Sequence, residues 1–354
     1  MFKSLFNNKS ILITGGTGSF GYNFTKEILM NHKPKKIVIY SRDEYKQYKM
    51  QNEEFFKKFY QKNNYLNILR FFIGDIRDKE RLKFAVKDNI DYVIHASALK
   101  QVPTCEYNPF EAVKTNILGA QNLIDVCLDS NVKKVIALST DKAASPINLY
   151  GATKLTSDKL FIAANYYKGK KDIKFSVVRY GNVMGSRGSV IPFFISLKGN
   201  KNIPVTDKRM TRFNITLSES VQFVIFCLKN MWGGELFVPK LPSYHILDLL
   251  DAISPNSKPK IIGIRSGEKI HEEMISKADS INTIDFKNYY AIMPSENLVQ
   301  WNIKDFINSS GKIKGKFCRE AFSYNSEDNS DFLKVNQIKK LISLNKSTFF
   351  DYNK

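Results

Sequence analysis

The sequence is poor in the residues that form disulfides or bind metals. Its 354 residues include four cysteines and four histidines. The cysteines lie far apart with no C-x-x-C spacing, and Cys127 and Cys227 fall in apolar helical runs. This pattern predicts reduced, buried thiols, as in cytoplasmic proteins. The histidines do not cluster with cysteines or acids, so we expect no metal site.

Long hydrophobic runs are also missing. No apolar run approaches the roughly 18 residues that a membrane-spanning helix needs. A strand-like run and a glycine-rich turn follow almost immediately after the first residue, so no secretory signal is visible. We therefore expect a soluble, cytoplasmic protein without a membrane partner.

Acidic residues are scarce relative to basic ones. The chain has 34 Asp and Glu against 54 Lys and Arg, a formal net charge of +20 at pH 7. A charge of this size is compatible with nucleic-acid binding. The lysines are, however, interleaved with acids along the whole chain, and no arginine-rich tract or RNA-binding signature appears. We expect no nucleic-acid partner, and a basic field that attracts an anionic diphosphate substrate.

Strand-like and helix-like runs alternate through the first half of the chain. The expected strands are residues 11–14, 36–40, 69–73, 92–95, 134–138 and 175–178. The expected helices are residues 21–31, 45–60, 80–87, 109–130 and 150–165. Alternation of this kind predicts a parallel sheet covered by helices on both faces. The fold class is therefore α/β, a Rossmann-like doubly wound sheet.

The pattern changes after Gly181, where glycine, proline and basic residues become frequent in loops. We expect residues 1–180 to form a dinucleotide-binding domain. Residues 181–345 are expected to form mainly a smaller substrate-binding lobe over the carboxyl ends of the strands. A last helix is expected at residues 335–344, and residues 346–354 form a tail open to disorder.

A glycine-rich turn follows the first strand. Gly15, Gly18 and Gly21 have G-x-x-G-x-x-G spacing, with an apolar-periodic run at residues 24–30 and a second strand at 36–40. Glycines let the backbone turn tightly beside a pyrophosphate, whose charge then meets the N-terminus of the next helix. The strand–turn–helix–strand context predicts a dinucleotide site and not an ordinary turn.

The residues after the second strand bear on the choice between NADP and NAD. Ser41 and Arg42 suit a ribose 2′-phosphate, which favours NADP. In the alternative interpretation Arg42 is a solvated residue at a helix start, and Asp43 grips the ribose hydroxyl of NAD.

Two further motifs carry the chemistry. The first is Ser139-Thr140-Asp141-Lys142, and the second is residues 150–154, Tyr-Gly-Ala-Thr-Lys. Tyr150 and Lys154 lie one helical turn apart and share a face. A cation there favours the phenolate, which can take a proton from a sugar hydroxyl during oxidation. Asp141 and Lys142 add an acid and an amine that oxidation alone does not need.

With these motifs the chain resembles the extended short-chain dehydrogenase/reductase superfamily. More closely, it resembles the inverting UDP-N-acetylglucosamine 4,6-dehydratases that open pseudaminic acid biosynthesis, from about residue 9 to about 340. Ser97 departs from the alanine more often found in such enzymes. The matching segments are residues 11–21, 40–44, 74–78, 95–103, 114–116, 138–144, 150–154, 178–183, 185–190, 210–213 and 263–269.

The resemblance implies roles for individual residues. Redox and acid–base work would belong to Thr140, Asp141, Lys142, Tyr150 and Lys154. The cofactor, NADP with NAD as the alternative, would contact Gly15, Thr17, Gly18, Ser19, Phe20, Gly21, Ser41, Arg42, Asp43, Lys46, Asp75, Ile76, Ala96, Lys100, Tyr150 and Lys154. The substrate UDP-N-acetylglucosamine would contact Lys100, Thr140, Asn182, Val190, Thr206, Met210, Arg212, Arg265 and Glu268. Similar enzymes assemble as dimers or hexamers, so a homo-oligomer is expected.

Lys142 separates the sub-classes of such dehydratases. Retaining enzymes that resemble this chain have glutamate at that position, and an amine implies that C5 is protonated from the opposite face. To act as a base the amine must be neutral, so we expect burial, Lys154 and Lys100 to lower its pKa. In the alternative, Lys142 only pairs with Asp141 structurally.

Two other functions remain open at this point. One is a retaining dehydratase, 4-epimerase or simple sugar dehydrogenase of the same superfamily. The other is a catalytically silent NADP-binding regulator or a nucleic-acid-binding protein. Arg212 and Arg265 would hold diphosphate in the enzyme interpretations and would be ordinary surface charges otherwise.

Overall fold

The computed structural model describes residues 4–60, 68–87, 89–186, 188–294, 299, 301–309, 314–346 and 349. Arg187, within one of the matching loops, lies outside the described residues. So does most of the tail expected at residues 346–354.

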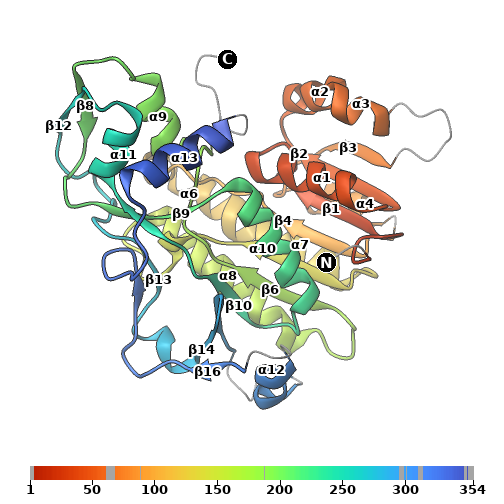
Figure 1. Ribbon diagram of the computed structural model, residues 1–354. Helices are drawn as coiled ribbons and strands as arrows, with labels where there is room; N and C mark the ends of the chain where they lie inside the picture. The colour runs from red at the N-terminus through yellow and green to blue at the C-terminus, as the bar shows by residue number, and fades with distance from the viewer. Residues whose placement is uncertain are drawn as a thin grey trace.

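Strands within the described residues form one ten-stranded sheet (Figure 1). Seven neighbouring strands are parallel: β3 (Leu69–Ile73), β2 (Lys36–Ser41), β1 (Ser10–Thr14), β4 (Tyr92–His95), β5 (Lys134–Leu138), β6 (Lys174–Val178) and β10 (Leu236–Pro239). Three antiparallel strands extend the sheet beyond β10: β15 (Tyr289–Ile292), β14 (Thr283–Phe286) and β16 (Lys316–Phe317). Every residue of β1 and β2 is buried, as in strands covered on both faces. The predicted Rossmann-like doubly wound class is confirmed.

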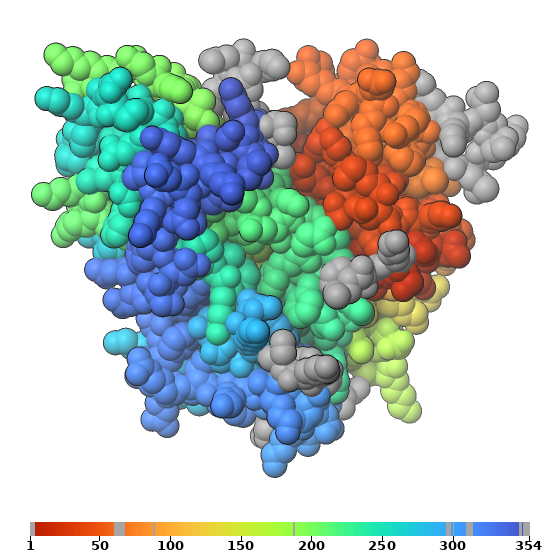
Figure 2. Space-filling view, in the orientation of Figure 1, coloured from red at the N-terminus to blue at the C-terminus, as the bar shows by residue number. Residues whose placement is uncertain are grey.

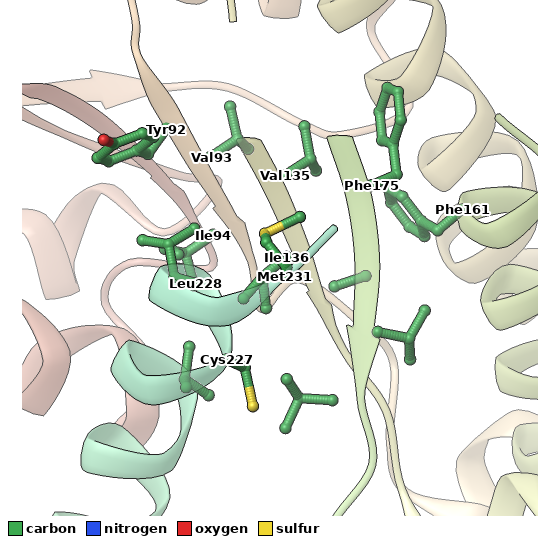
Figure 3. Close-up of a cluster of buried hydrophobic side chains, with 14 of the residues drawn as sticks. Tyr92, Val93, Ile94, Val135, Ile136, Phe161, Phe175, Cys227, Leu228 and Met231 are labelled. Atoms are coloured by element: carbon green, nitrogen blue, oxygen red, sulfur yellow. The ribbon is translucent and has the colours of Figure 1, made fainter. Parts of the chain in front are cut away.

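Helices connect the parallel strands. They are α1 (Ser19–Asn31), α2 (Glu44–Asn52), α3 (Glu54–Tyr60), α4 (Lys79–Val86), α5 (Val102–Tyr107), α6 (Pro109–Val113), α7 (Gly119–Leu128), α8 (Leu149–Tyr167) and α10 (Leu217–Asn230). Helix α1 packs against α10, and α7 packs against α4 and α8. Figure 3 shows side chains of β4, β5 and β6 meeting Phe161 of α8, Cys227 and Leu228 of α10, and Met231 at the C-cap of α10 in the core.

Two expected helices are interrupted. The helix expected at 45–60 divides at Glu53, which has an extended backbone (φ −67°, ψ 133°) and whose carboxylate accepts a hydrogen bond from Tyr22. The helix expected at 109–130 contains a π-helical turn, η1 (Lys114–Leu118). Within it, Asn116 bonds both backbone groups of Leu99 and the hydroxyl of Thr153. The π turn therefore aims a side chain that ties α8 to the loop after β4.

The second half of the chain contributes to two regions. Its strands β10, β14, β15 and β16 complete the main sheet, so the sheet crosses the expected boundary at residue 180, which stays a prediction. A smaller lobe, at the upper left of Figure 1, has its own hydrophobic core around α9 (Val190–Ser196), α11 (Ile246–Ile253) and α13 (Val335–Asn345). Figure 2 shows the surface of this lobe and the orange N-terminal surface on opposite sides of the top of the molecule.

The remaining elements are short. They are the strands β7 (Asn182–Val183), β8 (Asn202–Val205), β9 (Thr211–Ile215), β11 (Ser243–His245), β12 (Lys258–Ile261), β13 (Glu273–Ile275) and β17 (Tyr324–Asn325), and the helices η2 (Asp141–Ala143), α9 (Val190–Ser196), α11 (Ile246–Ile253), η3 (Asp279–Asn282), α12 (Ile303–Ser309) and α13 (Val335–Asn345). The sheets they form are β11–β9–β7, β12–β8 and β13–β17. Across the described ranges, no helix has the length and apolar character needed to cross a bilayer.

Candidate active site

One cavity of about 1430 Å³ collects almost all of the expected site residues. It lies where the carboxyl ends of the parallel strands face the smaller lobe, the usual ligand position in open α/β sheets. Asp75 is the exception, because it is absent from the lining. The expected residues that line the cavity are Gly15, Thr17, Gly18, Ser19, Phe20, Gly21, Ser41, Arg42, Asp43, Lys46, Ile76, Ala96, Lys100, Thr140, Asp141, Lys142, Tyr150, Lys154, Asn182, Val190, Thr206, Met210, Arg212, Arg265 and Glu268.

The glycine-rich turn forms one end of the cavity. Gly15 has a left-handed backbone (φ +68°), and a Cβ there would lie 2.8 Å from the carbonyl oxygen of Ala96. A Cβ at Gly21 would lie 2.6 Å from Cα of Gly16, so α1 can approach the turn only without a side chain. Gly18 occupies the N-cap of α1 without a side-chain cap. The first amides of the helix are therefore available to a phosphate, and the turn fits a dinucleotide.

Residues after β2 form a polar cluster beside this turn. The hydroxyl of Thr17 donates to Ser41 Oγ at 3.1 Å. Asp43 caps α2 by accepting from the Lys46 amide at 2.9 Å, and it also pairs with the Lys46 ammonium. The side chain of Arg42 is half exposed and lies 3.5 Å from Asp75. Because the carboxylate of Asp43 is engaged in capping, Arg42 is the better placed of the two to meet a ligand.

Asp75 makes contacts within the protein. Its carboxylate accepts two hydrogen bonds from the Arg77 guanidinium, at 2.7 and 3.0 Å. Burial opposes ionisation, but the bonds from Arg77 and the charge of Arg42 outweigh it and lower the pKa of Asp75. The expected adenine contact of this residue remains a prediction, while Ile76 next to it does line the cavity.

The start of α8 is pressed against the turn that carries Asp141 and Lys142. Asn148 caps the helix by accepting from the amide of Gly151 at 2.8 Å. A Cβ at Gly151 would lie 2.1 Å from the carbonyl oxygen of Lys142. Only glycine at this position allows Tyr150 to stand beside Thr140 and Lys142 on one wall of the cavity.

Tyr150 is a buried phenol. It packs with Cys105 and Ala112 and is 8% exposed. Burial raises its pKa to about 12, although the charge of Lys142 and a hydrogen bond from Thr140 act in the opposite direction. The sequence predicted that the Lys154 ammonium favours the phenolate. This direction is corrected, because burial raises the pKa of Tyr150 and also lowers the pKa of Lys154.

Lys142 lies between two carboxylates. Its Nζ is 3.1 Å from Oδ1 of Asp141 and 2.9 Å from Oε1 of Glu272. Burial alone would lower the pKa of this amine, but the charges of the two carboxylates raise it above its ordinary value. The sequence-based expectation of a lowered pKa is wrong, because the charge of Asp141, together with that of Glu272, outweighs burial.

The two carboxylates differ from each other. Burial and the charge of Glu272 raise the pKa of Asp141. Burial also opposes ionisation of Glu272, but Lys142 and Arg212 lower its pKa. Asp141 Oδ2 and Glu272 Oε2 are both buried and have no hydrogen-bond partner within the described part of the chain. Asp141 is thus the more easily protonated of the pair, and Glu272 is the anion.

A second buried network lies behind Tyr150. Asp158 accepts a hydrogen bond from Ser139 at 2.6 Å and pairs with Arg179 at 3.3 Å. Burial lowers the pKa of Lys154, and the charge of Asp158 partly offsets this. Sequence reasoning missed Asp158, although its i+4 spacing from Lys154 on one helix is a usable signal.

Arg212 and Arg265 differ in surroundings. The Arg212 guanidinium donates to the carbonyl oxygens of Thr211, Lys269 and Ile270, and lies 3.7 Å from Glu268 and 3.6 Å from Glu272. Arg265 is exposed at the cavity. No carboxylate of the described residues pairs with Arg265. Arg265 is therefore the more available cation for a diphosphate, and Arg212 holds the segment that carries Glu268.

The described residues contain no group of three or more His, Cys, Asp or Glu side chains arranged to hold a metal ion. Cys105, Cys127 and Cys227 are buried free thiols, and Cys318 is partly buried.

Comparison with known proteins adds a family and several relatives. The family model described as polysaccharide biosynthesis protein matches residues 11–294. The UDP-N-acetylglucosamine 4,6-dehydratase (inverting) of Campylobacter jejuni subsp. jejuni is 54% identical over 341 residues, 96% of this chain and 98% of that protein. The UDP-glucose 4-epimerase of Rickettsia bellii is 43% identical over 317 residues, 87% of this chain and 89% of that protein. The X-ray structure of Pen from Bacillus thuringiensis has a TM-score of 0.84 and 38% identity, covering 98% of this chain and 100% of that one.

Proposed function

Because this chain belongs to the polysaccharide biosynthesis protein family, we propose that it is a UDP-N-acetylglucosamine 4,6-dehydratase that inverts C5. The product is UDP-2-acetamido-2,6-dideoxy-β-L-arabino-hexos-4-ulose, and the reaction is the hydro-lyase step that opens pseudaminic acid biosynthesis. One observation carries the proposal: Tyr150, Asp141 and Lys142 share one wall of a cavity whose other end is a dinucleotide turn.

The cofactor is NADP. Gly15 and Gly18 leave room for the pyrophosphate, and Ser41, Arg42 and Lys46 surround the place of the 2′-phosphate. The capping role of Asp43 supports NADP over NAD, since that carboxylate is engaged within the protein. When bound, the oxidised nicotinamide would supply positive charge and a reversible hydride acceptor within reach of the sugar.

Oxidation at C4 needs a base at the hydroxyl. Tyr150 first loses its own phenolic proton to solvent, which the positive charge of an oxidised nicotinamide would favour. The phenolate then accepts the C4 hydroxyl proton, with Thr140 hydrogen-bonded to the same oxygen. The charge of Lys142 and the Thr140 hydrogen bond both lower the pKa of the phenol. Asp158 bonds Ser139 and Arg179 and so anchors the helix face that also carries Tyr150 and Lys154. The C4 ketone that results from oxidation makes the C5 proton acidic.

Loss of water needs an acid and a base together. A proton moves from the Lys142 ammonium to the Asp141 carboxylate across 3.1 Å, which gives a neutral amine and a neutral acid. The amine takes the C5 proton, and Asp141 protonates the C6 oxygen as it leaves as water. Lys142 then carries a proton and Asp141 a charge, so the pair ends as it began. Solvent supplies a new proton to C5 from the opposite face, which inverts that centre, and the proton that Tyr150 took from the C4 hydroxyl returns to solvent.

UDP is held by the lobe side of the cavity. The diphosphate meets Arg265, the ribose and base meet Glu268, Asn182 and Val190, and Lys100 reaches both ligands. Thr206 and Met210 line the same side, where the Thr206 hydroxyl donates to the sulfur of Met210 at 3.0 Å. Assembly as a homo-oligomer and a cytoplasmic location stay predictions.

A UDP-glucose 4-epimerase is the second candidate, because relatives with that name share 43% of residues with this chain. Incubation of the native protein with UDP-N-acetylglucosamine in deuterated water distinguishes the two. The dehydratase forms a product that has lost water and carries deuterium at C5. An epimerase forms an isomer of unchanged mass, and a protein that only binds the nucleotide forms neither.

A further inference from the structure

Glu272 is a buried carboxylate to which neither the motifs nor the comparisons assign a role. It directly precedes β13 and is 2% exposed, yet it lines the cavity beside Lys142. Its amide donates to Ser326 Oγ at 2.9 Å, and its carbonyl oxygen accepts from the Ser326 amide at 2.8 Å. These two backbone bonds fix the residue against β17, so the carboxylate is held in place before any ligand binds.

The cluster around Glu272 contains two cationic and two carboxylate side chains. It contacts Lys142 at 2.9 Å and Arg212 at 3.6 Å, while Asp141 contacts only the Lys142 ammonium among these cations. If a proton moves from Lys142 to Asp141, both of those groups become neutral and the pair of Glu272 and Arg212 remains. The cluster therefore keeps the same net charge before and after the transfer, which limits the cost of moving a proton inside a buried site.

Three contacts also link the segment around Glu272 to the catalytic turn, which is η2 with the residues that follow it, 141–145. Lys269 Nζ donates to the Ala144 carbonyl at 2.7 Å, and Ser145 Oγ donates to Glu273 at 2.7 Å. The third contact is the bond from Lys142 to Glu272 itself. The position of the amine thus depends on a segment of the smaller lobe that also carries Glu268.

We propose that Glu272 is a positioning residue for the C5 step, an anion throughout the cycle that holds the Lys142 amine against Asp141 and sets the pH range in which their shared proton is available. The inference rests on the proposed dehydratase function. Glu272 itself takes up no proton and acts on the sugar only through the Lys142 amine that it contacts. The titratable or charged groups that face this cluster are Asp141 and Lys142 of η2, Tyr150 of α8, Arg212 of β9, Tyr244 of β11 and Lys269 before β13.

The direction of the effect follows from the charge. An anion stabilises the proton on both Lys142 and Asp141, so its removal lets that pair lose both protons at lower pH. Glu272→Gln keeps the shape and one acceptor oxygen but removes the charge. We expect both limbs of its kcat profile against pH to move toward acid by on the order of one pH unit.

Two further variants distinguish a positioning role of Glu272 from an effect on folding. Glu272→Asp keeps the charge but draws it back from Lys142, so the pH profile stays near the native one while kcat falls about tenfold or more. Glu273→Gln is the matched control, because that neighbouring carboxylate accepts from Ser145 and not from Lys142. Its profile should coincide with the native one, and thermal unfolding of each variant reports on folding.

The outcomes are distinct. An unshifted profile for Glu272→Gln, or a native kcat for Glu272→Asp, overturns the role of Glu272 while leaving the dehydratase function intact. Equal shifts for Glu272→Gln and Glu273→Gln also overturn it, because the effect would then be one of general surface charge. If the native protein forms no dehydrated product, the proposed function fails before the variants are compared.

Discussion

A Cβ on Gly151 would lie 2.1 Å from the carbonyl oxygen of Lys142, so the first turn of α8 rests directly on the catalytic turn. This contact sets the distance between Tyr150 and Lys142. The two residues serve different steps, and one substrate can meet both only if the helix and the turn stay in register.

Gly151→Ala should therefore lower both stability and activity. The new methyl group meets backbone and not a flexible side chain, so we expect a loss of about 1–3 kcal/mol in unfolding free energy and a marked fall in kcat. Urea unfolding and turnover of the purified variant measure the two effects. Ala152→Ser, at the exposed next position, is the control. A variant with native stability and turnover would show that the contact is not needed.

Tyr150→Phe should abolish turnover and leave binding of UDP-N-acetylglucosamine nearly unchanged. Only the phenolic oxygen is lost, and a positioned acid–base group contributes about 10²–10⁴-fold to rate. Calorimetric titration with the UDP-sugar and a turnover assay separate binding from chemistry. Near-native activity would remove Tyr150 from the oxidation step.

Local sequence patterns predicted most of the main sheet. Strands β3, β4 and β5 begin and end at the expected residues, because short apolar runs between polar turns specify buried parallel strands. The antiparallel strands β14, β15 and β16 were not anticipated. They are short, and β16 is exposed, so they carry little of the apolar signal that marks a central strand.

The site was predicted less completely than the sheet. Motif spacing predicted that Tyr150, Lys154 and Asp141 lie together, and all three line the cavity. Tyr150 and Lys154 lie in the first two turns of α8, and Asp141 begins η2. Glu272 could not be found in this way, because 130 residues separate it from Lys142 and no local pattern links them. Its charge adds to that of Asp141 in raising the pKa of Lys142, the opposite of the expected direction.

Arg42→Ala should weaken NADP far more than NAD. The guanidinium would meet the 2′-phosphate, and loss of charge-assisted bonds of about 1.5–3 kcal/mol corresponds to about 10- to 100-fold in affinity. Calorimetry with each cofactor measures both constants. Arg77→Ala is the control, since that guanidinium also bonds Asp75 but does not line the cavity. If Arg42→Ala lost equal affinity for NADP and NAD, Asp43 and not Arg42 would be the residue that distinguishes the two cofactors.

Acid should destabilise the fold through His95. Burial and the charge of Lys154 lower the pKa of this imidazole to about 3, against 6.5 ordinarily. Between about pH 3 and pH 6.5 the unfolded chain therefore binds more protons at His95 than the folded protein does. The free energy of unfolding then decreases as pH falls below about 6.5. The loss reaches about 2 kcal/mol at pH 5.

Urea unfolding of the native protein and of His95→Gln at pH 7.5 and 5 tests this. The variant should show a smaller decrease in stability between the two values. His245→Gln, at an exposed position, should behave like the native protein. An equal decrease in native protein and His95→Gln would assign the acid sensitivity to other groups.

Lys142→Ala should stop the reaction after the C4 ketone has formed. Oxidation uses Tyr150 and Lys154, whereas loss of the C5 proton needs the amine, so we expect slow reduction of bound NADP and little or no dehydrated product. Absorbance of the reduced nicotinamide and mass analysis of the sugar report the two steps. Lys170→Ala, at an exposed lysine, is the control. Normal dehydration by Lys142→Ala would assign C5 deprotonation elsewhere.

The central claim is that the amine at position 142 gives inversion at C5, and the configuration of the fresh product tests it most directly. Native protein is incubated with UDP-N-acetylglucosamine, and the ring proton couplings of the product are measured by NMR before it can rearrange. We predict the L-arabino configuration. A D-xylo product would contradict the account and would place this chain among the retaining dehydratases.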